Sequence, residues 1–270
     1  MKQVLYWILL LLLFAVLLFP IYLMISNSLS PIKGFLRSPP RLTPYEWTLD
    51  NYRRAFALPH LPRWIANTLF LAVMTIVGGV LINGAAGYAF CFCRVRWLKY
   101  IFWAFMLPIF VSGYVLIIAQ IQIVTSIGLS GIPAVVSMGL FWSVGIFLFR
   151  NYFRTIPHEI VEVARIDGAA EWRILLQVVL PMSRPIIGAA VVFLGMGVLG
   201  GFVWQMLNLQ AIETRTYLVG LMATTLDVYA VKNIGYDLTV GTLLFLPYLA
   251  LFAVSSRYFV KGLTGGALKG

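Results

Sequence analysis

Charge is scarce in this chain of 270 residues: 11% of the residues are charged, whereas 61% are hydrophobic. A soluble domain carries charge on about a quarter of its residues. The shortage therefore excludes a soluble globular protein and indicates a membrane protein. Acidic residues are especially few, and the net charge of +11 comes from basic residues dispersed at the ends of apolar runs. Dispersed bases are typical of anchors at a membrane surface and do not form the basic face that nucleic acid requires.

Cysteine and histidine are equally rare, with two of each in the chain. Cys91 and Cys93 are separated by one residue at the end of an apolar run, which is a weak metal signal, and we interpret both as packing residues. His60 and His158 lie on opposite sides of the predicted membrane. A membrane-embedded enzyme would need a nucleophile with a base or a metal cluster, so this separation disfavours an enzyme.

No phosphate-binding loop of the form Gly-x-x-x-x-Gly-Lys-Ser/Thr occurs, and the chain has no Gly-Lys dipeptide. If ATP drives this protein, a separate subunit must therefore bind it. Ionisable residues are also absent from the cores of the predicted spans. Coupled carriers commonly use such residues as relays within the membrane. A secondary carrier or channel for a small neutral solute remains the alternative function, although it would need a coupling or selectivity group.

Long uncharged runs predict an all-α, polytopic membrane protein with six transmembrane helices in a single domain, 1–270. The segment between Lys2 and Lys33 and the segment 64–93 contain no charge, and each is long enough for a span of about 20 residues. The uncharged run 101–149 holds two crossings joined by a Gly- and Pro-rich turn at 126–133. A short helix is also predicted near 50–56. The predicted spans are about 4–26, 65–92, 100–125, 134–152, 185–208 and 238–257.

The loops predict the orientation of these spans. Six crossings place both termini on one side, together with the loop 94–99 and a longer polar loop, 154–181. Three basic residues crowd into the loop 94–99, whereas the turn 126–133 has none. Because basic residues favour the cytoplasmic side, we expect both termini and the loop 154–181 to be cytoplasmic.

The polar loop has a helical pattern that predicts two short amphipathic helices. The expected apolar stripes are Ile156, Ile160, Val163 and Ile166 in the first helix and Trp172, Leu175, Leu176 and Val179 in the second. Pro157 suits an opening turn, and Asp167-Gly168 interrupts the pattern because glycine adopts left-handed dihedrals without a Cβ penalty. Such a hairpin could lie on the lipid headgroups or dock into a groove of a soluble partner.

The residue identities in this loop favour docking. Glu162-Val163-Ala164 is followed by three residues and Gly168, and nine more residues lead to Val178-Val179-Leu180-Pro181. This spacing resembles the EAA motif of ATP-binding-cassette (ABC) importer permeases. The run 164–169 is similar to the version found in carbohydrate-uptake permeases of the maltose type. The tail 257–270 also resembles the end of many such permeases, so the resemblance covers most of the chain.

The resemblance implies the type I permease fold of ABC importers and a place in the bacterial cytoplasmic (inner) membrane. The chain would form half of a pore in a heterodimer with a second permease subunit. Two ATPase subunits would bind ATP and Mg²⁺, and a periplasmic or extracellular solute-binding protein would deliver the solute, so this chain itself is expected to hold no cofactor and no catalytic residue. The residues implied to couple to the ATPase are Glu162, Ala164, Arg165, Asp167, Gly168, Ala169 and Trp172.

Neutral polar and aromatic residues within the spans indicate the class of solute. Sugars, oligosaccharides and glycerol-like polyols offer hydroxyls and apolar C–H faces without charge. The candidate pathway residues are Asn83, Gln120, Trp142, Trp204, Gln205 and Asn208. Each could instead pack between helices or lie at the membrane interface. Trp204 and Gln205 are the favoured candidates, because residues 200–205 depart from the Trp-Asn-x-Phe-x-Trp-Pro pattern that is frequent in the resembled family.

Overall fold

The computed structural model describes residues 2–31, 42–44, 46–225 and 233–267, with side chains described from Gln3 to Ala253. All regular secondary structure in these ranges is helical, which confirms the predicted all-α class. In chain order the elements are α1 (Lys2–Ser28), α3 (Asp50–Phe56), α4 (Leu61–Phe92), α5 (Leu98–Met106), η1 (Leu107–Phe110), α6 (Gly113–Ser126), α7 (Gly131–Leu140), α8 (Ser143–Phe153), α9 (His158–Ile166), α10 (Glu171–Arg173), η2 (Ile174–Val179), α11 (Leu180–Met182), α12 (Arg184–Gly200), α13 (Phe202–Asn208), α14 (Tyr217–Thr225) and α15 (Ile234–Ala267).

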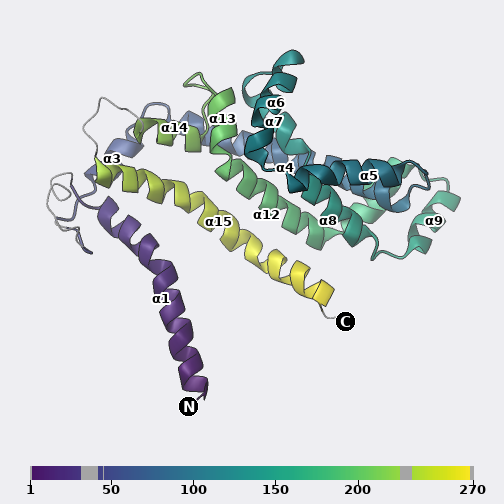
Figure 1. Ribbon diagram of the computed structural model, residues 1–270, viewed down its shortest axis with the longest axis horizontal. Coiled ribbons are helices and arrows are strands. Elements are labelled where there is room, and N and C mark those ends of the chain that lie inside the picture. The colour runs from purple at the N-terminus through teal and green to yellow at the C-terminus, as the bar shows by residue number, and fades with distance from the viewer. Residues whose placement is uncertain (1, 32–41, 45, 226–232, 268–270) are drawn as a thin grey trace.

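The N-terminal part of α1 extends away from an elongated bundle formed by the other helices, and α1 contacts α15 (Figure 1). Its side chains between Val4 and Phe19 are exposed and apolar on every side. A helix of this kind is stable in lipid, whereas in water its whole apolar surface would be exposed to solvent. Ser28 ties the last turn of α1 to the bundle: its hydroxyl lies 2.7 Å from that of Tyr52, and its carbonyl accepts a hydrogen bond from Thr239 at 3.0 Å.

Helix α4 runs through the bundle and packs against α7, α8 and α12. Small residues on α4 allow the closest of these contacts. A Cβ at Gly87 would lie 2.7 Å from Cβ of Phe149 and 2.9 Å from the backbone nitrogen of Arg150. Helices in lipid associate through such close backbone approach, since lipid tails give no hydrophobic drive between them. Gly87 therefore fixes how closely α4 and α8 pack.

Several of the membrane helices are bent or broken. Among the described residues, α1, α4, the run 131–153 and the described part of α15 are each long and apolar enough to cross a membrane. Two bent pairs raise this number to six if each is one span: α5 with η1 meets α6 at 117°, and Glu171–Met182 meets α12 at 88°. The first bend falls inside the predicted span 100–125, where hydropathy gives no sign of it.

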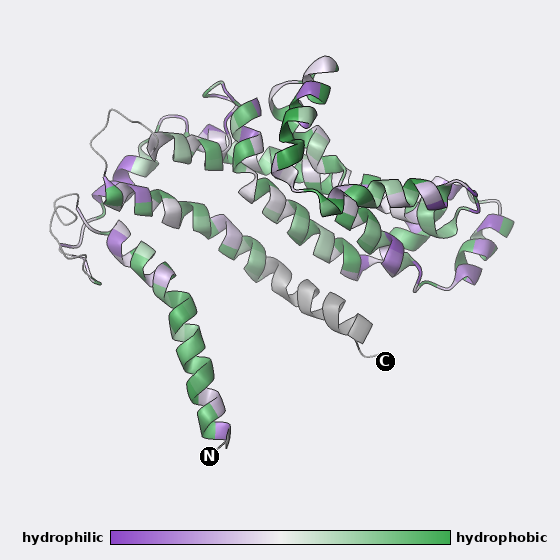
Figure 2. Ribbon diagram, in the orientation of Figure 1, coloured by the Kyte–Doolittle hydropathy of each residue, from purple (hydrophilic) through white to green (hydrophobic). Residues whose placement is uncertain are grey.

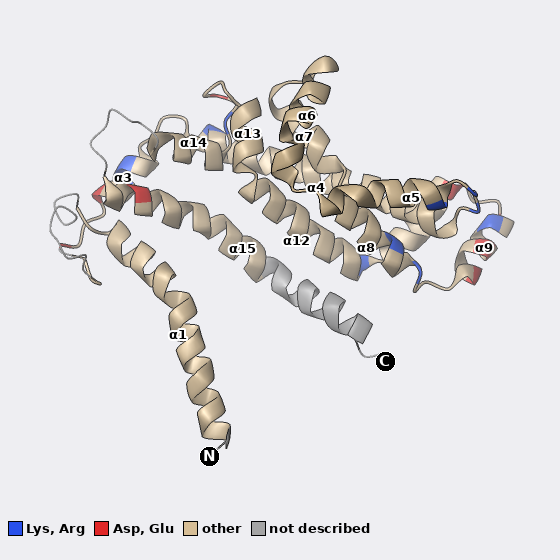
Figure 3. Ribbon diagram, in the orientation of Figure 1, with Lys and Arg blue, Asp and Glu red and all other residues tan. Residues whose placement is uncertain are grey.

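Charged residues lie at the two ends of the bundle (Figure 3). One group surrounds α9 and the adjoining ends of α5 and α8, and the other surrounds α3 and α14, while the described residues between them are uncharged. Figure 2 shows hydrophobic residues over the same middle layer. This division matches a lipid bilayer, whose hydrocarbon core is about 30 Å thick and is bounded by polar surfaces.

Candidate functional site

The polar loop forms the predicted hairpin at one end of the bundle. Its first helix, α9, ends at Ile166, and Gly168 follows with a φ of +79°. The N–H of Gly168 donates to the carbonyl of Arg165 and the N–H of Ala169 donates to that of Ala164, both at 3.0 Å. This is the Schellman arrangement, in which a left-handed residue closes a helix. The predicted role of Gly168 as the break between two helices is confirmed.

The inner face of the hairpin joins the core of the bundle. Val161 and Ile174 are 1% and 0% exposed, and they pack in one cluster with Phe92 and Phe153. The predicted apolar stripes, expected to meet lipid or a partner, divide between the two faces. Three of their residues are buried in the same cluster: Ile156, Leu175 and Val179. Four others are exposed: Val163, Ile166, Trp172 and Leu176. Apolar residues occur on both faces of the hairpin helices, so their spacing did not determine which face packs inward.

A polar network fastens the hairpin to the end of α4. Arg165 donates from Nε to Oε1 of Glu171 at 2.7 Å and from Nη2 to Oε2 at 3.1 Å. The same guanidinium donates to the carbonyl of Phe92 at 3.2 Å, and the hydroxyl of Tyr88 donates to Glu171 at 2.5 Å. Arg165, predicted as a coupling residue, therefore turns inward. Arg165 and Glu171 lie on either side of the glycine turn, and their separation does not match a helical spacing. The sequence therefore did not reveal Glu171 or Tyr88.

The charge of Glu171 is favoured by this network. The hydrogen bond from Arg165 lowers the pKa of the Glu171 carboxyl, and the same bond raises the pKa of Arg165. A carboxyl with a lowered pKa stabilises the fold above its unfolded pKa of about 4.3, and this stabilisation is lost as the pH falls through the folded value. Because the Glu171 side chain is 52% exposed, solvent screens part of the interaction.

We expect Glu171→Gln to loosen the hairpin without unfolding the bundle, because Arg165 loses a charged partner. Hydrogen exchange of the α9 amides should become faster at neutral pH. Glu159→Gln, at an exposed position of α9, is the matched control and should leave the exchange rates unchanged. Equal exchange in the two variants would contradict the fastening role of Glu171.

The other predicted coupling residues lie on or near the hairpin surface. Glu162 pairs with Arg94 at 2.8 Å, in a surface ion pair of the kind that contributes up to about 1 kcal/mol. Asp167 is exposed in the turn. Ala164 and Ala169 are half-buried against the apolar cluster at the base of the hairpin. Arg94 is a further contact that the sequence did not single out.

Three apolar side chains form the outer face of the hairpin. Val163, Ile166 and Trp172 are 57%, 85% and 58% exposed, and the guanidinium of Arg173 lies 5.2 Å from the centre of the Trp172 ring. The hairpin with α9 stands at a charged end of the bundle rather than in its apolar middle (Figure 3). Exposed apolar groups with a polar rim are typical of a surface that another protein covers.

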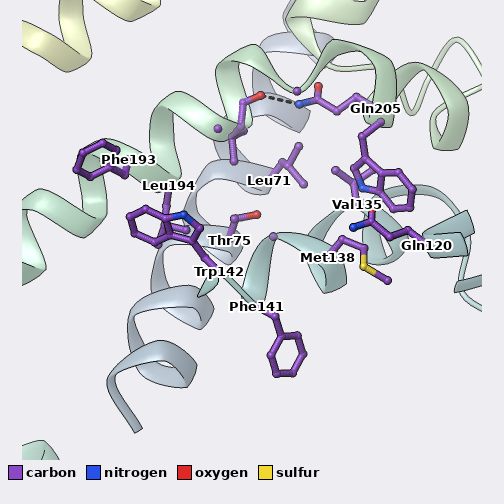
Figure 4. Close-up of a pocket in the computed structure, with 15 residues that line it drawn as sticks. Leu71, Thr75, Gln120, Val135, Met138, Phe141, Trp142, Phe193, Leu194 and Gln205 are labelled. Atoms are coloured by element: carbon purple, nitrogen blue, oxygen red, sulfur yellow. Dashed lines mark hydrogen bonds between the residues drawn. The ribbon is translucent and has the colours of Figure 1, made fainter. Parts of the chain in front are cut away.

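The second candidate site is a half-open cavity of about 330 Å³ between helices of the bundle (Figure 4). Residues of α4, α6, α7, α12 and α13 line it, together with Phe141 and Trp142 from the break between α7 and α8. None of the described residues that line it is charged, and four of them are aromatic: Phe141, Trp142, Phe193 and Trp204. A cavity of this size and composition can take a small uncharged ligand.

Four of the six predicted pathway residues line this cavity: Gln120, Trp142, Trp204 and Gln205. Gln205 uses its side chain in the fold, since it donates to the carbonyl of Val198 (Figure 4) and accepts from Thr216, both at 2.5 Å. In contrast, Nε1 of Trp204 is buried and has no hydrogen-bond partner within the described part of the chain. A buried N–H without a partner is costly, and because this one exposes almost no surface, it would reach a ligand oxygen only after the indole moves.

The remaining two predicted pathway residues are not among those that line the cavity. Asn208 donates to the carbonyl of Trp204 at 2.9 Å, one helical turn earlier. Asn83 is fully buried, and its side chain bonds to the backbone at the break between α7 and α8. Both therefore make contacts within the bundle.

Together, the fold and the two sites define a transmembrane transport subunit: an apolar bundle with an uncharged, half-open cavity and a polar hairpin at one end. Residues 94–264 match the family described as "Binding-protein-dependent transport system inner membrane component", and the chain belongs to this family. It is thus the permease subunit of an ABC importer in the inner membrane. Its role is transport rather than catalysis, and ATP binds to the ATPase partner. The family assignment replaces the alternative of a secondary carrier or channel.

Curated relatives and a solved structure agree with this assignment. The chain is 28% identical over 253 residues to the sn-glycerol-3-phosphate transport system permease protein UgpE of Brucella suis, covering 91% of this chain and 90% of the relative. It is 27% identical over 256 residues to the arabinooligosaccharides transport system permease protein AraQ of Halalkalibacterium halodurans, covering 93% and 91%. A chain of a bacterial ABC transporter involved in the import of the acidic polysaccharide alginate shares the fold, with a TM-score of 0.82, 21% identity and 96% of both chains covered.

Proposed function

We propose that this permease forms half of the pathway for a neutral sugar, oligosaccharide or glycerol-like polyol. The observation that carries this proposal is the uncharged, partly aromatic lining of the cavity. Aromatic rings pack on the C–H faces of such solutes, and an N–H donor binds a hydroxyl. The relatives named for sn-glycerol-3-phosphate and arabinooligosaccharides handle hydroxylated compounds. The wall of this cavity favours a neutral one, because a buried anion without a cation is costly.

The same proposal gives the hairpin its role. The outer face, Val163, Ile166 and Trp172, docks into a groove of an ATPase subunit, and Glu162 and Asp167 make polar contacts at its edge. Closure of two ATPase subunits then moves the hairpin, and the contacts of Arg165 and Glu171 with the end of α4 transmit this movement to the bundle. A second, different permease subunit completes the pore, and a solute-binding protein docks at the opposite end.

The proposed orientation places the hairpin and both termini in the cytoplasm. Three basic residues of the loop 94–99 lie at the hairpin end, which agrees with the preference of short basic loops for that side. In Figure 1, α1 begins and α15 ends away from the end of the bundle that carries α3 and α14. The end with α3 and α14 would then face the periplasm or the cell exterior.

We expect Trp204→Phe to weaken solute transport while the complex still assembles, because phenylalanine retains an aromatic ring and removes the N–H donor. Loss of one hydrogen bond corresponds to an increase of about fivefold in the KM for uptake. Uptake would be measured in proteoliposomes with a panel of monosaccharides, oligosaccharides, glycerol and glycerol phosphate. Trp97→Phe, at a site 71% exposed outside the cavity, is the control. An unchanged KM for every transported solute would show that the cavity is not the pathway.

A further inference from the structure

The break between α7 and α8 lies inside an apolar run long enough to span the membrane. Phe141 and Trp142 are extended there, with φ/ψ of −101°/107° and −126°/101°. In an unbroken helix the carbonyl of Leu140 would accept from Val144 and the N–H of Trp142 would donate to Met138. The break removes both bonds, and backbone groups at membrane depth must find other partners.

Asn83 of α4 supplies these partners. Its Nδ2 donates to the carbonyl of Leu140 at 2.9 Å, and its Oδ1 accepts from the N–H of Trp142 at 3.1 Å. Nδ2 also donates to the carbonyl of Gly79 at 2.5 Å, which fixes the side chain on its own helix. Asn83 is 0% exposed, so no water competes for these bonds. One carboxamide therefore stabilises the break on both sides of Phe141.

The break determines where two aromatic side chains of the cavity wall lie. Phe141 and Trp142 both line the cavity, and the ring of Trp142 packs 5.4 Å from that of Phe193. The ring of Trp142 also lies directly over Gly145, where a Cβ would overlap it. The backbone that carries these side chains is thus held by Asn83 rather than by a helix of its own.

Helix α4 also carries the contacts of the hairpin. Tyr88, which donates to Glu171, follows Asn83 by five residues, or about 7.5 Å along the helix. We propose that Asn83 is the positioning residue of the solute cavity. It holds the backbone at the α7–α8 break in its extended conformation, and it makes the cavity wall move with α4. The first half of this proposal concerns the structure alone, whereas the link to transport rests on the proposed function.

The structural half is tested by the reactivity of cysteines introduced into the cavity wall of the purified complex. Phe141→Cys reports on the break and Trp204→Cys on α13, each combined with Cys91→Ser and Cys93→Ser. We expect Asn83→Asp, which keeps the acceptor and gives up both donors, to change the maleimide labelling rate at position 141 about tenfold and that at 204 less than twofold. Equal changes at both positions, or none at 141, would overturn the proposal.

Two further variants guard against a failure to fold. Asn83→Ser carries no charge and should produce the same selective change if the Asp variant does not assemble. Asn27→Asp makes the same substitution at an asparagine that donates to the carbonyl of Leu23 one turn earlier in α1. This control should leave both labelling rates unchanged. A similar change in the control would mean that the labelling reports general loosening, and this too would overturn the proposal.

The transport half is tested by a double-mutant cycle on the KM for uptake. If Asn83 acts through Trp142, the effects of Asn83→Ser and Trp142→Phe should overlap, whereas those of Asn83→Ser and Trp204→Phe should multiply. Full multiplication with Trp142 would refute the link. If neither tryptophan variant alone alters uptake, the proposed function of the cavity fails, while the labelling result still decides whether Asn83 holds the break.

Discussion

Ile166→Glu will separate the permease from its ATPase partner without removing it from the membrane. Ile166 is 85% exposed on the outer face of the hairpin, so a carboxylate is tolerated in the free subunit. In the proposed docked state the same carboxylate would be buried in an apolar groove, where an unpaired charge costs about 3 kcal/mol or more. This corresponds to a loss of affinity of at least about a hundredfold.

The measurement is the amount of ATPase subunit that co-purifies with the permease, together with the stimulated ATPase rate. Gln177→Glu adds the same charge at another exposed position of the hairpin and serves as the control. Membrane levels of both variants should equal that of the unmodified chain. Normal co-purification of the Ile166 variant would mean that the outer face meets no partner, and that the hairpin lies free or against lipid.

Gly87→Ala will destabilise the bundle itself. The added methyl group would lie 2.7 Å from Cβ of Phe149 and 2.9 Å from the backbone nitrogen of Arg150, and neither of these atoms can rotate away. The helices α4 and α8 must separate, and a close-packed interface tolerates such overpacking at a cost of about 1–3 kcal/mol. Because α4 also carries Asn83 and Tyr88, the cavity and the seat of the hairpin should loosen as well.

Thermal unfolding in detergent measures this effect, with an expected decrease in Tm of about 5 °C or more. Gly113→Ala is the matched control, because a Cβ there meets nothing within 4 Å at the start of α6. Its Tm should be unchanged or slightly higher, since alanine loses less backbone entropy than glycine in a helix. A stable Gly87 variant would show that α4 and α8 can separate freely, which contradicts the close approach assigned to them.

The hairpin shows how much of a site can be read from residue order. The spacing of Glu162, Gly168 and Pro181 indicated the helix pair, its turn and its family, since these depend on local dihedrals and on identities along the chain. The sequence did not show that Arg165 turns inward to Glu171 and Tyr88. The hydrogen bonds to Tyr88 and Phe92 join segments about 80 residues apart. Packing rather than spacing along the chain decides these partners.

The cavity could be predicted from the sequence less fully than the hairpin. Polar and aromatic residues within the spans indicated the candidates, and four of the six line the cavity. Asn83 and Asn208 are not among the lining residues. Hydropathy could not predict which way their side chains point around the helix axis, because lipid and protein interior are both apolar. The bend before Gly113 and the break at Phe141 and Trp142 were likewise hidden inside uniformly apolar runs.

The sequence by itself determined the helical class, the membrane location, the hairpin with its glycine turn and the family, because these follow from charge, hydropathy and local backbone preference. Only the tertiary structure decided which faces of the helices pack inward, where the spans bend, and which side chains enclose the cavity. The physical reason is that an apolar helix in an apolar medium has no preferred side until neighbouring backbones and buried hydrogen bonds select one.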